Sequence, residues 1–174
     1  YTTLDGTGLS VDEVLAAVGR GCHALDSTAL PLVVNTGNSF LLVPLRDGDT
    51  VRRAVPDRTA ITKVSDALDL IGFYLFSPET VLPGRDAGAR MFAPRFGIAE
   101  ESATGMAAGP LACFLHDVMR LRQEEFLIEQ GYFMVPPSPS LLRVRLHTED
   151  GEIRGLTVGG RARVSETTTV EVQG

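Results

Sequence analysis

The chain of 174 residues contains few of the residues that mark several large classes of protein. It has only two cysteines, Cys22 and Cys113, and they form neither a CxxC pair nor a disulfide framework. Both lie in apolar sequence surroundings, where buried free thiols are common. This cysteine usage is typical of a reducing compartment, so we expect a cytoplasmic protein.

Long apolar runs and a targeting segment are also missing. The longest apolar runs, LPLVV and FLLVPL, are far shorter than the roughly 20 residues that a membrane-spanning helix needs. The first residues, YTTLDGTGLS, have neither the basic flank nor the apolar core of a signal peptide. We therefore expect a soluble protein without a membrane partner. The chain does not begin with Met, which is typical of a processed protein or of a piece of a longer one.

Basic residues are outnumbered by acidic ones. The 16 Lys and Arg residues against 22 Asp and Glu give a formal net charge of -6. Nucleic-acid binding needs a concentrated basic face, whereas the basic clusters VRRAV and LRVRLH are short and typical of solvated surfaces. We expect no nucleic-acid partner. The sequence also has no His, Cys and Asp cluster with metal-ligand spacing, so it implies neither a metal nor a cofactor.

The composition present in the chain is that of a globular protein. It is 44% hydrophobic and 22% charged, and its length suits a single domain over residues 1–174. Helical spacing predicts a short helix over Ser10 to Val18, with Ser10 and Glu13 as its capping box. Two apolar runs joined by the turn Asn35 to Asn38 predict a β-hairpin.

Further patterns predict the remaining elements. Helical spacing extends over Val51 to Leu70, and the segments IGFYLFSP and ARMFAP are typical of strands. PPSPS predicts a stiff turn. In the last part of the chain, LLRVRLHTEDGEIRGLTVGGRARV, alternation around a central EDG predicts a β-hairpin or meander.

One segment is apolar around almost its whole helical circumference. Between Met106 and Leu121 the large apolar residues are separated mostly by Ala and Gly, which is typical of a buried helix. With strands on both sides in sequence, we expect an α+β fold in which a curved mixed or antiparallel sheet wraps around a central buried helix. Pro110 cannot donate to an established helix. We therefore expect the regular helix over Pro110 to about Gln123, with Gly105 to Gly109 as a separate turn.

A polar turn, EESATG, runs directly into this apolar segment. A buried helix leaves amide groups at its N-terminus that need a polar partner and favour an anion. One interpretation is therefore a ligand site, to which the turn brings carboxylates and small residues. The other is an ordinary helix cap, with Thr104 or Ser102 capping and the glutamates complementing the helix dipole.

The same residues carry a family resemblance. RMFAPRFGIAEESATGMAAGPLACFL resembles the signature of the PhzF-like isomerases of phenazine biosynthesis, which have the diaminopimelate epimerase-like fold. The likeness extends to NTGNSFLLVPL upstream and to EQGYFM and GLTVGGRARV downstream. It implies two similar domains, each a sheet curled around a central helix, with the active site in the cleft between them. This chain resembles the second, C-terminal domain only.

The resemblance implies a function and a set of site residues. The function is acid/base proton transfer on a small carboxylate-bearing metabolite, with the catalytic base in a missing N-terminal domain. Glu101 would be the catalytic proton shuttle or orienting group, and Thr104, Gly105 and Met106 would bind the substrate. We expect the isolated chain to be inactive. We also expect it to expose an apolar surface with a polar rim near residues 101–106, and to form a homo-oligomer or pair with its missing domain.

Several positions depart from the family signature. The family has aspartate at Glu101, proline at Ser102 and a substrate-contacting serine at Met106, and its later M-G-R-P-S is MVPPSPS here. None of His23, His116 and His147 falls in a matching motif. Thiol racemases of this fold place a cysteine where Thr104 stands, so two-thiol chemistry is disfavoured. The alternative hypothesis is a non-catalytic small-molecule-binding or interaction protein with a decayed site.

Overall fold

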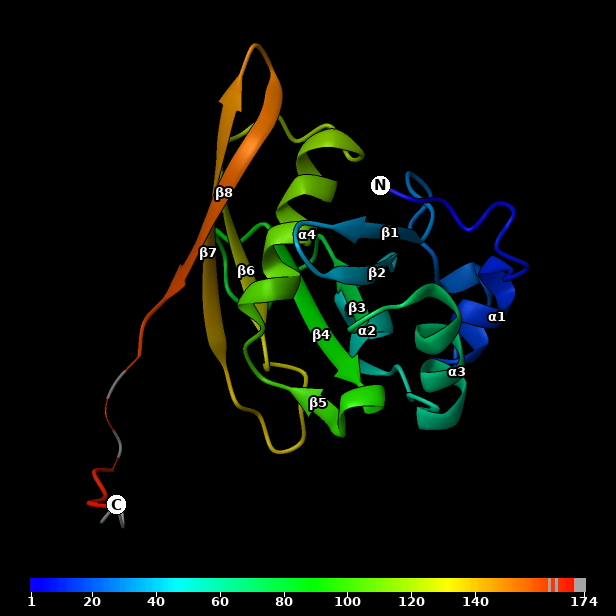
Figure 1. Cartoon of the computed structure of the whole chain (residues 1–174), viewed down its shortest axis with the longest axis horizontal. Coiled ribbons are helices and arrows are strands. Elements are labelled where there is room, and N and C mark those ends of the chain that lie inside the picture. Colours follow the sequence, from blue (N-terminus) through cyan, green and yellow to red (C-terminus); the bar gives the residue numbers. More distant parts are fainter. Residues whose placement is uncertain (163, 165, 171–174) are drawn as a thin grey trace, which may run out of the picture.

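One mixed sheet organises the protein (Figure 1), which we describe from a computed structural model for residues 1–162, 164 and 166–170. Within these residues the sheet has eight strands in the order β1-β2-β3-β4-β6-β7-β8, with β5 paired to β4 beside this path. The strands are β1 (Leu32–Asn35), β2 (Ser39–Pro44), β3 (Gly72–Ser77), β4 (Ala87–Ala93), β5 (Ile98–Glu101), β6 (Glu125–Gln130), β7 (Ser140–Glu149) and β8 (Glu152–Gly160).

Side-chain caps start three of the four helices in the described residues. The helices are α1 (Val11–Ala16), α2 (Gly48–Arg52), α3 (Arg58–Leu68) and α4 (Gly105–Asp117), with short 3₁₀ turns η1 (Cys22–Ala24) and η2 (Pro94–Phe96). The predicted capping box of Ser10 and Glu13 is present at the start of α1. The single helical stretch expected over Val51 to Leu70 is instead two helices, α2 and α3, which are capped by Asp47 and Asp57.

Helix α4 is the central buried helix that the sequence predicts. Residues 107–116 are all buried, and α4 packs against β1, β2, β7 and β8. Its side chains join the inner faces of the strands in one apolar cluster, in which the rings of Phe76 and Phe114 meet edge to face at 5.4 Å. Figure 1 shows α4 between the β1–β2 hairpin and the β7–β8 hairpin. The predicted α+β fold, a curved sheet around a buried helix, is confirmed.

The predicted ends of this helix are wrong. The regular helix begins at Gly105 rather than Pro110, and it ends at Asp117 rather than near Gln123. Pro110 lacks the N–H that would bond to the carbonyl of Met106, yet the helix continues through it with Pro110 in its interior. At the other end the chain turns away at Arg120, whose φ is +63°.

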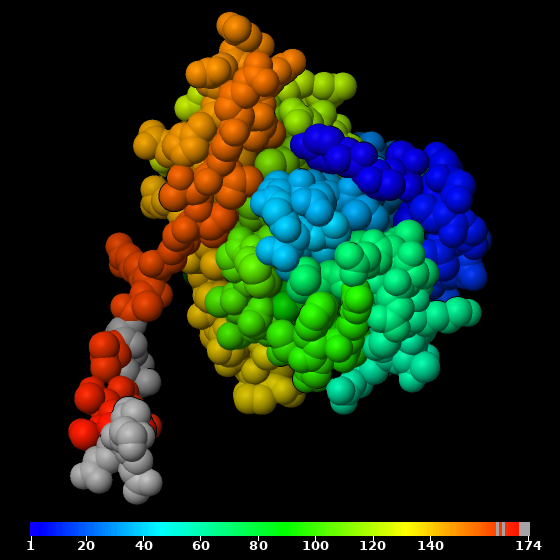
Figure 2. Space-filling model, in the orientation of Figure 1, coloured from blue at the N-terminus to red at the C-terminus, as the bar shows by residue number. Residues whose placement is uncertain are grey.

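Both predicted hairpins are present. Strands β1 and β2 pair antiparallel across the turn that follows Asn35, and β7 and β8 pair across Asp150 and Gly151. Both turn residues of the second hairpin have positive φ, which suits the Asp-Gly sequence. In Figure 2 this hairpin (orange) stands out from the rounded body formed by the first half of the chain.

The sequence did not predict the strands β5 and β6, nor the layer of helices outside the sheet. Strands β2 and β3 run parallel, as do β4 and β6. The crossover between β2 and β3 contains α2 and α3, which pack with α1 on the outer face in a second apolar cluster. The crossover between β4 and β6 contains β5, which pairs with β4 in the sheet, and α4, which packs on the inner face. Among the described residues, no helix has the length and apolarity needed to cross a membrane.

Candidate active site

Glu101 lies at the end of β5, three residues before Thr104, the N-cap residue of α4. Its carboxylate is partly buried, and its Oε2 accepts a hydrogen bond of 2.5 Å from the hydroxyl of Thr104. Glu101 makes no ion pair with any described residue. The polar turn therefore does bring a carboxylate to the start of the buried helix, as the sequence indicates.

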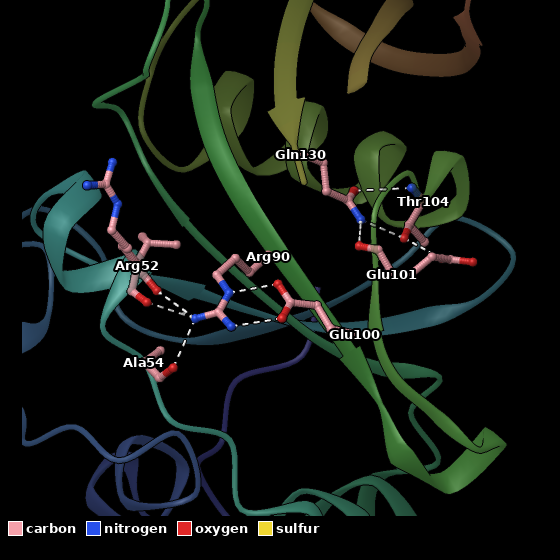
Figure 3. Close-up of polar contacts among 8 residues, drawn as sticks. Arg52, Ala54, Arg90, Glu100, Glu101, Thr104 and Gln130 are labelled. Atoms are coloured by element: carbon pink, nitrogen blue, oxygen red, sulfur yellow. Dashed lines mark hydrogen bonds and ion pairs between the residues drawn. The ribbon is translucent and has the colours of Figure 1, made fainter. Parts of the chain in front are cut away.

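Gln130, at the end of β6, holds Thr104 from the other side (Figure 3). Its side-chain oxygen accepts from the backbone amide of Thr104 at 3.1 Å. Its side-chain nitrogen donates to the hydroxyl oxygen of Thr104 at 2.9 Å and to the carbonyl of Glu101 at 2.6 Å. Thr104 is 3% exposed and Gln130 is fully buried, so these bonds are shielded from water.

Each hydrogen bond around Gln130 has a defined donor and acceptor. The hydroxyl of the buried Tyr74 also donates to the side-chain oxygen of Gln130, at 2.9 Å. Burial, and after it the negative charge of Glu101, raises the pKa of Tyr74, which keeps the phenol protonated and able to donate. The amide of Gln130 therefore accepts two bonds and donates two, which uses its full capacity. Because the Thr104 oxygen accepts from Gln130, its own proton is directed to Glu101.

The loop after β6 supports this arrangement. Gly131 has φ of +81°, and a side chain there would meet the carbonyl of Ser138 at 2.0 Å, so only glycine fits. The hydroxyl of Ser140 lies 2.5 Å from the carbonyl of Ser102 and 3.2 Å from the carbonyl of Gln130. The loop over residues 131–139 contains the predicted PPSPS turn except for its last residue, Ser140, which begins β7. Through Ser140 this loop is held against the turn that carries Glu101.

The start of α4 is open at its first two residues. Thr104 stands at the N-cap position, but its side chain makes no capping hydrogen bond. The interpretation in which the Thr104 side chain caps the helix is therefore wrong. Gly105 is partly exposed, and the Met106 side chain is 57% exposed. The amide groups at this end carry the positive end of the helix dipole.

A hollow of about 350 Å³ lies beside this helix end. It is bounded by the β1–β2 turn, the first residues of α4 and the inward side chains of β8, namely Leu156 and Val158. The side-chain amide of Asn38 reaches the sulfur of Met106 at 3.4 Å across it. An apolar wall with a polar rim therefore lies next to Gly105 and Met106, as expected from the sequence.

The structure brings Glu101, Thr104, Gly105 and Met106 together at one end of α4, and it adds two residues that sequence reasoning missed. Gln130 and Tyr74 are distant in sequence from the polar turn and are joined to it only by the fold. The sequence offered one signal for Gln130, because EQGYFM is part of the resemblance. Tyr74, within an apolar strand, gave none.

The remaining candidates lie elsewhere. His23 and His147 are exposed, and His116 is buried near the end of α4, where its Nδ1 lies 2.8 Å from the carboxylate of Asp117. Cys113 is buried within α4, and burial, followed by the charge of Asp117, raises the pKa of its thiol to about 11. Among the residues that the structure describes, no group of three or more His, Cys, Asp or Glu side chains is placed to hold a metal ion.

Comparison with known proteins gives a consistent result. Residues 9–168 match the family model described as "Phenazine biosynthesis-like protein". The "Uncharacterized isomerase YddE" of Escherichia coli (strain K12) is 28% identical over 157 residues, which cover 86% of this chain and 52% of that protein. A "Trans-2,3-dihydro-3-hydroxyanthranilate isomerase" of Pseudomonas fluorescens is 33% identical over 103 residues, covering 59% of this chain and 33% of that protein.

A solved structure supports the same fold. A predicted epimerase from Pseudomonas aeruginosa is 27% identical, with a TM-score of 0.64 over 96% of this chain and 55% of that chain. The chain therefore spans about half the length of the curated and structural relatives it matches.

Proposed function

This chain belongs to the phenazine biosynthesis-like (PhzF-like) family, in which several matched relatives are named isomerases, and we propose that it supplies half of an isomerase active site. The proposed reaction is acid/base proton transfer on a small molecule that carries a carboxylate. The observation that carries this proposal is the Glu101 carboxylate, which one hydroxyl holds in a fixed orientation at the open end of a buried helix.

The geometry around Glu101 suits a proton-transferring group. The Thr104 hydroxyl occupies Oε2, and no described residue donates a hydrogen bond to Oε1. One oxygen is therefore oriented by the protein while the other is available to a substrate. General acid–base groups need this combination of fixed position and access to the reacting proton.

The start of α4 would hold the substrate's carboxylate. The backbone amides of Gly105 and Met106 lie at the positive end of α4, which stabilises a bound anion by about 0.3–1 kcal/mol and by up to ~2 kcal/mol when partly buried. Thr104 contributes through Glu101 rather than as a cap. The hollow beside Met106 would take the apolar part of a small substrate.

A complete site would need a second half. The match covers only about half of the relatives' length, and in the proposal the catalytic base comes from the part that this chain does not include. We propose that the exposed surface around Met106 pairs with that half, or with a second copy of this chain in its absence. Because the isolated chain would lack the catalytic base, we expect it to be inactive.

Kinetics of Glu101→Gln with the complementary half present, in one polypeptide or co-expressed, test the proposal. The first substrate to try is trans-2,3-dihydro-3-hydroxyanthranilate, because a relative is named for it. We expect kcat/KM to fall by about 10²-fold or more, the scale of acid–base assistance. Glu125→Gln, on the far side of the sheet, is the control and should leave turnover unchanged. Equal turnover by Glu101→Gln and the unmodified protein would contradict the assignment.

Met106 favours a second candidate function. It places an exposed thioether where a hydroxyl would serve a substrate better, which suits a protein that binds a small carboxylate without converting it. Met106→Ser separates the two functions: an isomerase should hold or gain turnover. Calorimetric binding of the same compound by a protein that shows no turnover in either form would support the binding function.

A further inference from the structure

The residue before Glu101 makes the most enclosed ion pair among the described residues. The two carboxylate oxygens of Glu100 accept from Nε and Nη2 of Arg90, each at 2.8 Å. The two side chains are only 17% and 9% exposed. A two-bond contact between a guanidinium and a carboxylate fixes orientation as well as distance, so Glu100 is held in one place on β5.

Arg90 is anchored on its other side by the backbone. Its Nη1 donates to the carbonyls of Val51, Arg52 and Ala54, at 2.9–3.2 Å, where α2 ends. The last carbonyls of a helix lack intrahelical donors, and here the carbonyl of Val51 also accepts from the backbone amide of Ala54 at 3.2 Å. Arg90 therefore joins three elements, namely its own strand β4, the end of α2 and, through Glu100, the strand β5.

Strand β5 has little backbone pairing of its own. It is four residues long and pairs only with β4, and its register shifts between Met91 and Ala93. Such a short, irregular strand has few backbone bonds to define where it lies. Consecutive side chains of a strand point to opposite faces, and Figure 3 shows Glu100 directed to Arg90 while Glu101 is directed to Thr104.

We propose that Arg90 and Glu100 are positioning residues that set the location of the Glu101 carboxylate. Their contact is on the face opposite to the candidate site, and it acts through the backbone, because adjacent Cα atoms are joined at a fixed distance of about 3.8 Å. The catalytic consequence rests on the function proposed above. The structural consequence does not.

Arg90→Lys tests the structural part, because lysine keeps the charge and loses the planar five-donor group. Arg95→Lys is the matched control. Arg95 lies in the connection between β4 and β5 and likewise contacts carboxylates, those of Asp66 and Asp69, and backbone carbonyls near the end of α3. Unlike Glu100, none of these partners is on β5. Glu100→Gln is a second variant, which removes one side of the two-bond contact with less loss of volume.

The readout is the side-chain amide of Gln130 in ¹⁵N-labelled chain. Both of its protons are donated, to Glu101 and Thr104, so hydrogen exchange should be slow and the resonances shifted from those of free glutamine. We expect Arg90→Lys and Glu100→Gln to shift these resonances and speed the exchange, and Arg95→Lys to leave both unchanged. Global loss of stability alone does not move native resonances. Unchanged Gln130 resonances in folded Arg90→Lys or Glu100→Gln, or equal shifts in Arg95→Lys, would overturn the proposal.

Kinetics with the complementary half present then separate the two proposals. A displacement near 1 Å can lower rates by about 10²-fold, so we expect Arg90→Lys to lower kcat by up to that factor and to change KM much less. If the Gln130 resonances move while Glu101→Gln leaves turnover unchanged, the positioning role stands and the proposed function fails. If the resonances stay, the positioning role fails whatever the kinetics show.

Discussion

The two halves of the sheet are built differently. Strands β2, β3 and β4 are buried along almost their whole length, because α4 covers the inner face and α1 to α3 cover the outer face. Strand β7 alternates, with Leu142, Val144 and Leu146 buried against α4 and arginines exposed between them. One side of the sheet therefore has three layers and the other has two.

This difference explains how the same sheet carries two sequence patterns. A strand covered on both faces can be apolar at every position, whereas a strand covered on one face alternates. It also places the candidate site, because Glu101 and Gln130 lie beside each other where the three-layer half meets the two-layer half. In the three-layer half a charged side chain must be paired, as Arg90 is, while in the two-layer half arginines reach solvent.

The largest expected effect is on the doubly covered strands. Phe76→Ala should lower the free energy of unfolding by about 3–5 kcal/mol, because it removes a fully buried ring that packs on Phe114. Leu141→Ala, on the outer face of β7 beside an open hollow of about 790 Å³, should cost less than about 1 kcal/mol. Urea unfolding of both variants measures the contrast, and equal losses would show that the two halves are equally packed.

Replacing an arginine should cost more stability in the three-layer half of the sheet than in the two-layer half. Arg90→Met leaves Glu100 enclosed without its partner, which should cost about 3 kcal/mol. Arg145→Met removes an exposed arginine that lies 3.7 Å from Glu125, and should change stability by about 0.5 kcal/mol or less. Thermal unfolding at matched pH and salt compares the two, and a costly Arg145→Met would mean that the outer face of β7 is covered in solution.

The smallest expected effect is the loss of stability at low pH that comes from Asp47, in the outer layer of helices. Hydrogen bonds from Thr50 lower the pKa of Asp47, the N-cap of α2. A carboxyl with a lowered folded-state pKa stabilises the protein above its unfolded value, near 3.9, and that contribution is lost as the pH falls through the folded value. Asp47→Ala should cost about 1 kcal/mol near neutral pH.

Asp47→Asn provides the control for this acid effect, because asparagine caps a helix as well as aspartate does and does not titrate. Between about pH 5 and about pH 2 its Tm should fall less steeply than that of the unmodified protein. Parallel pH profiles of the two proteins would argue against a role for Asp47 ionisation in holding α2 on the sheet.

Much of the fold could be predicted from local pattern. Apolar residues all around the segment after Met106 predict its burial, and Ser10, Asn35 to Asn38 and EDG mark a helix start and two turns. These signals succeed because each depends on neighbouring residues. The ends of α4 could not be predicted in this way, because the helix contains Pro110 in its interior and because Arg120 adopts a positive φ just beyond its end.

Long-range pairing limited the prediction of the site. Glu101 and Thr104 were identified from one short motif. Gln130 and Tyr74 join them only because the parallel pairing of β4 with β6 and the antiparallel pairing of β3 with β4 bring three distant segments together. Arg90 and Glu100 were missed because β5 and its pairing with β4 were not predicted. A charged residue within a doubly covered strand is nevertheless a signal, because burial there requires a partner.

The crossover around α4 also has a consequence for how the protein folds. The β7–β8 hairpin closes across Asp150 and Gly151, and hairpins of this kind form in about 1–10 μs. The pairing of Ala89 with Gln130 must instead enclose β5 and all of α4, and contacts so distant in sequence form slowly. We expect the hairpin to be an early event and the closure of β4 on β6 a late one. Because Gln130 reaches Glu101 and Thr104 only after that closure, the candidate site would be assembled at the end of folding.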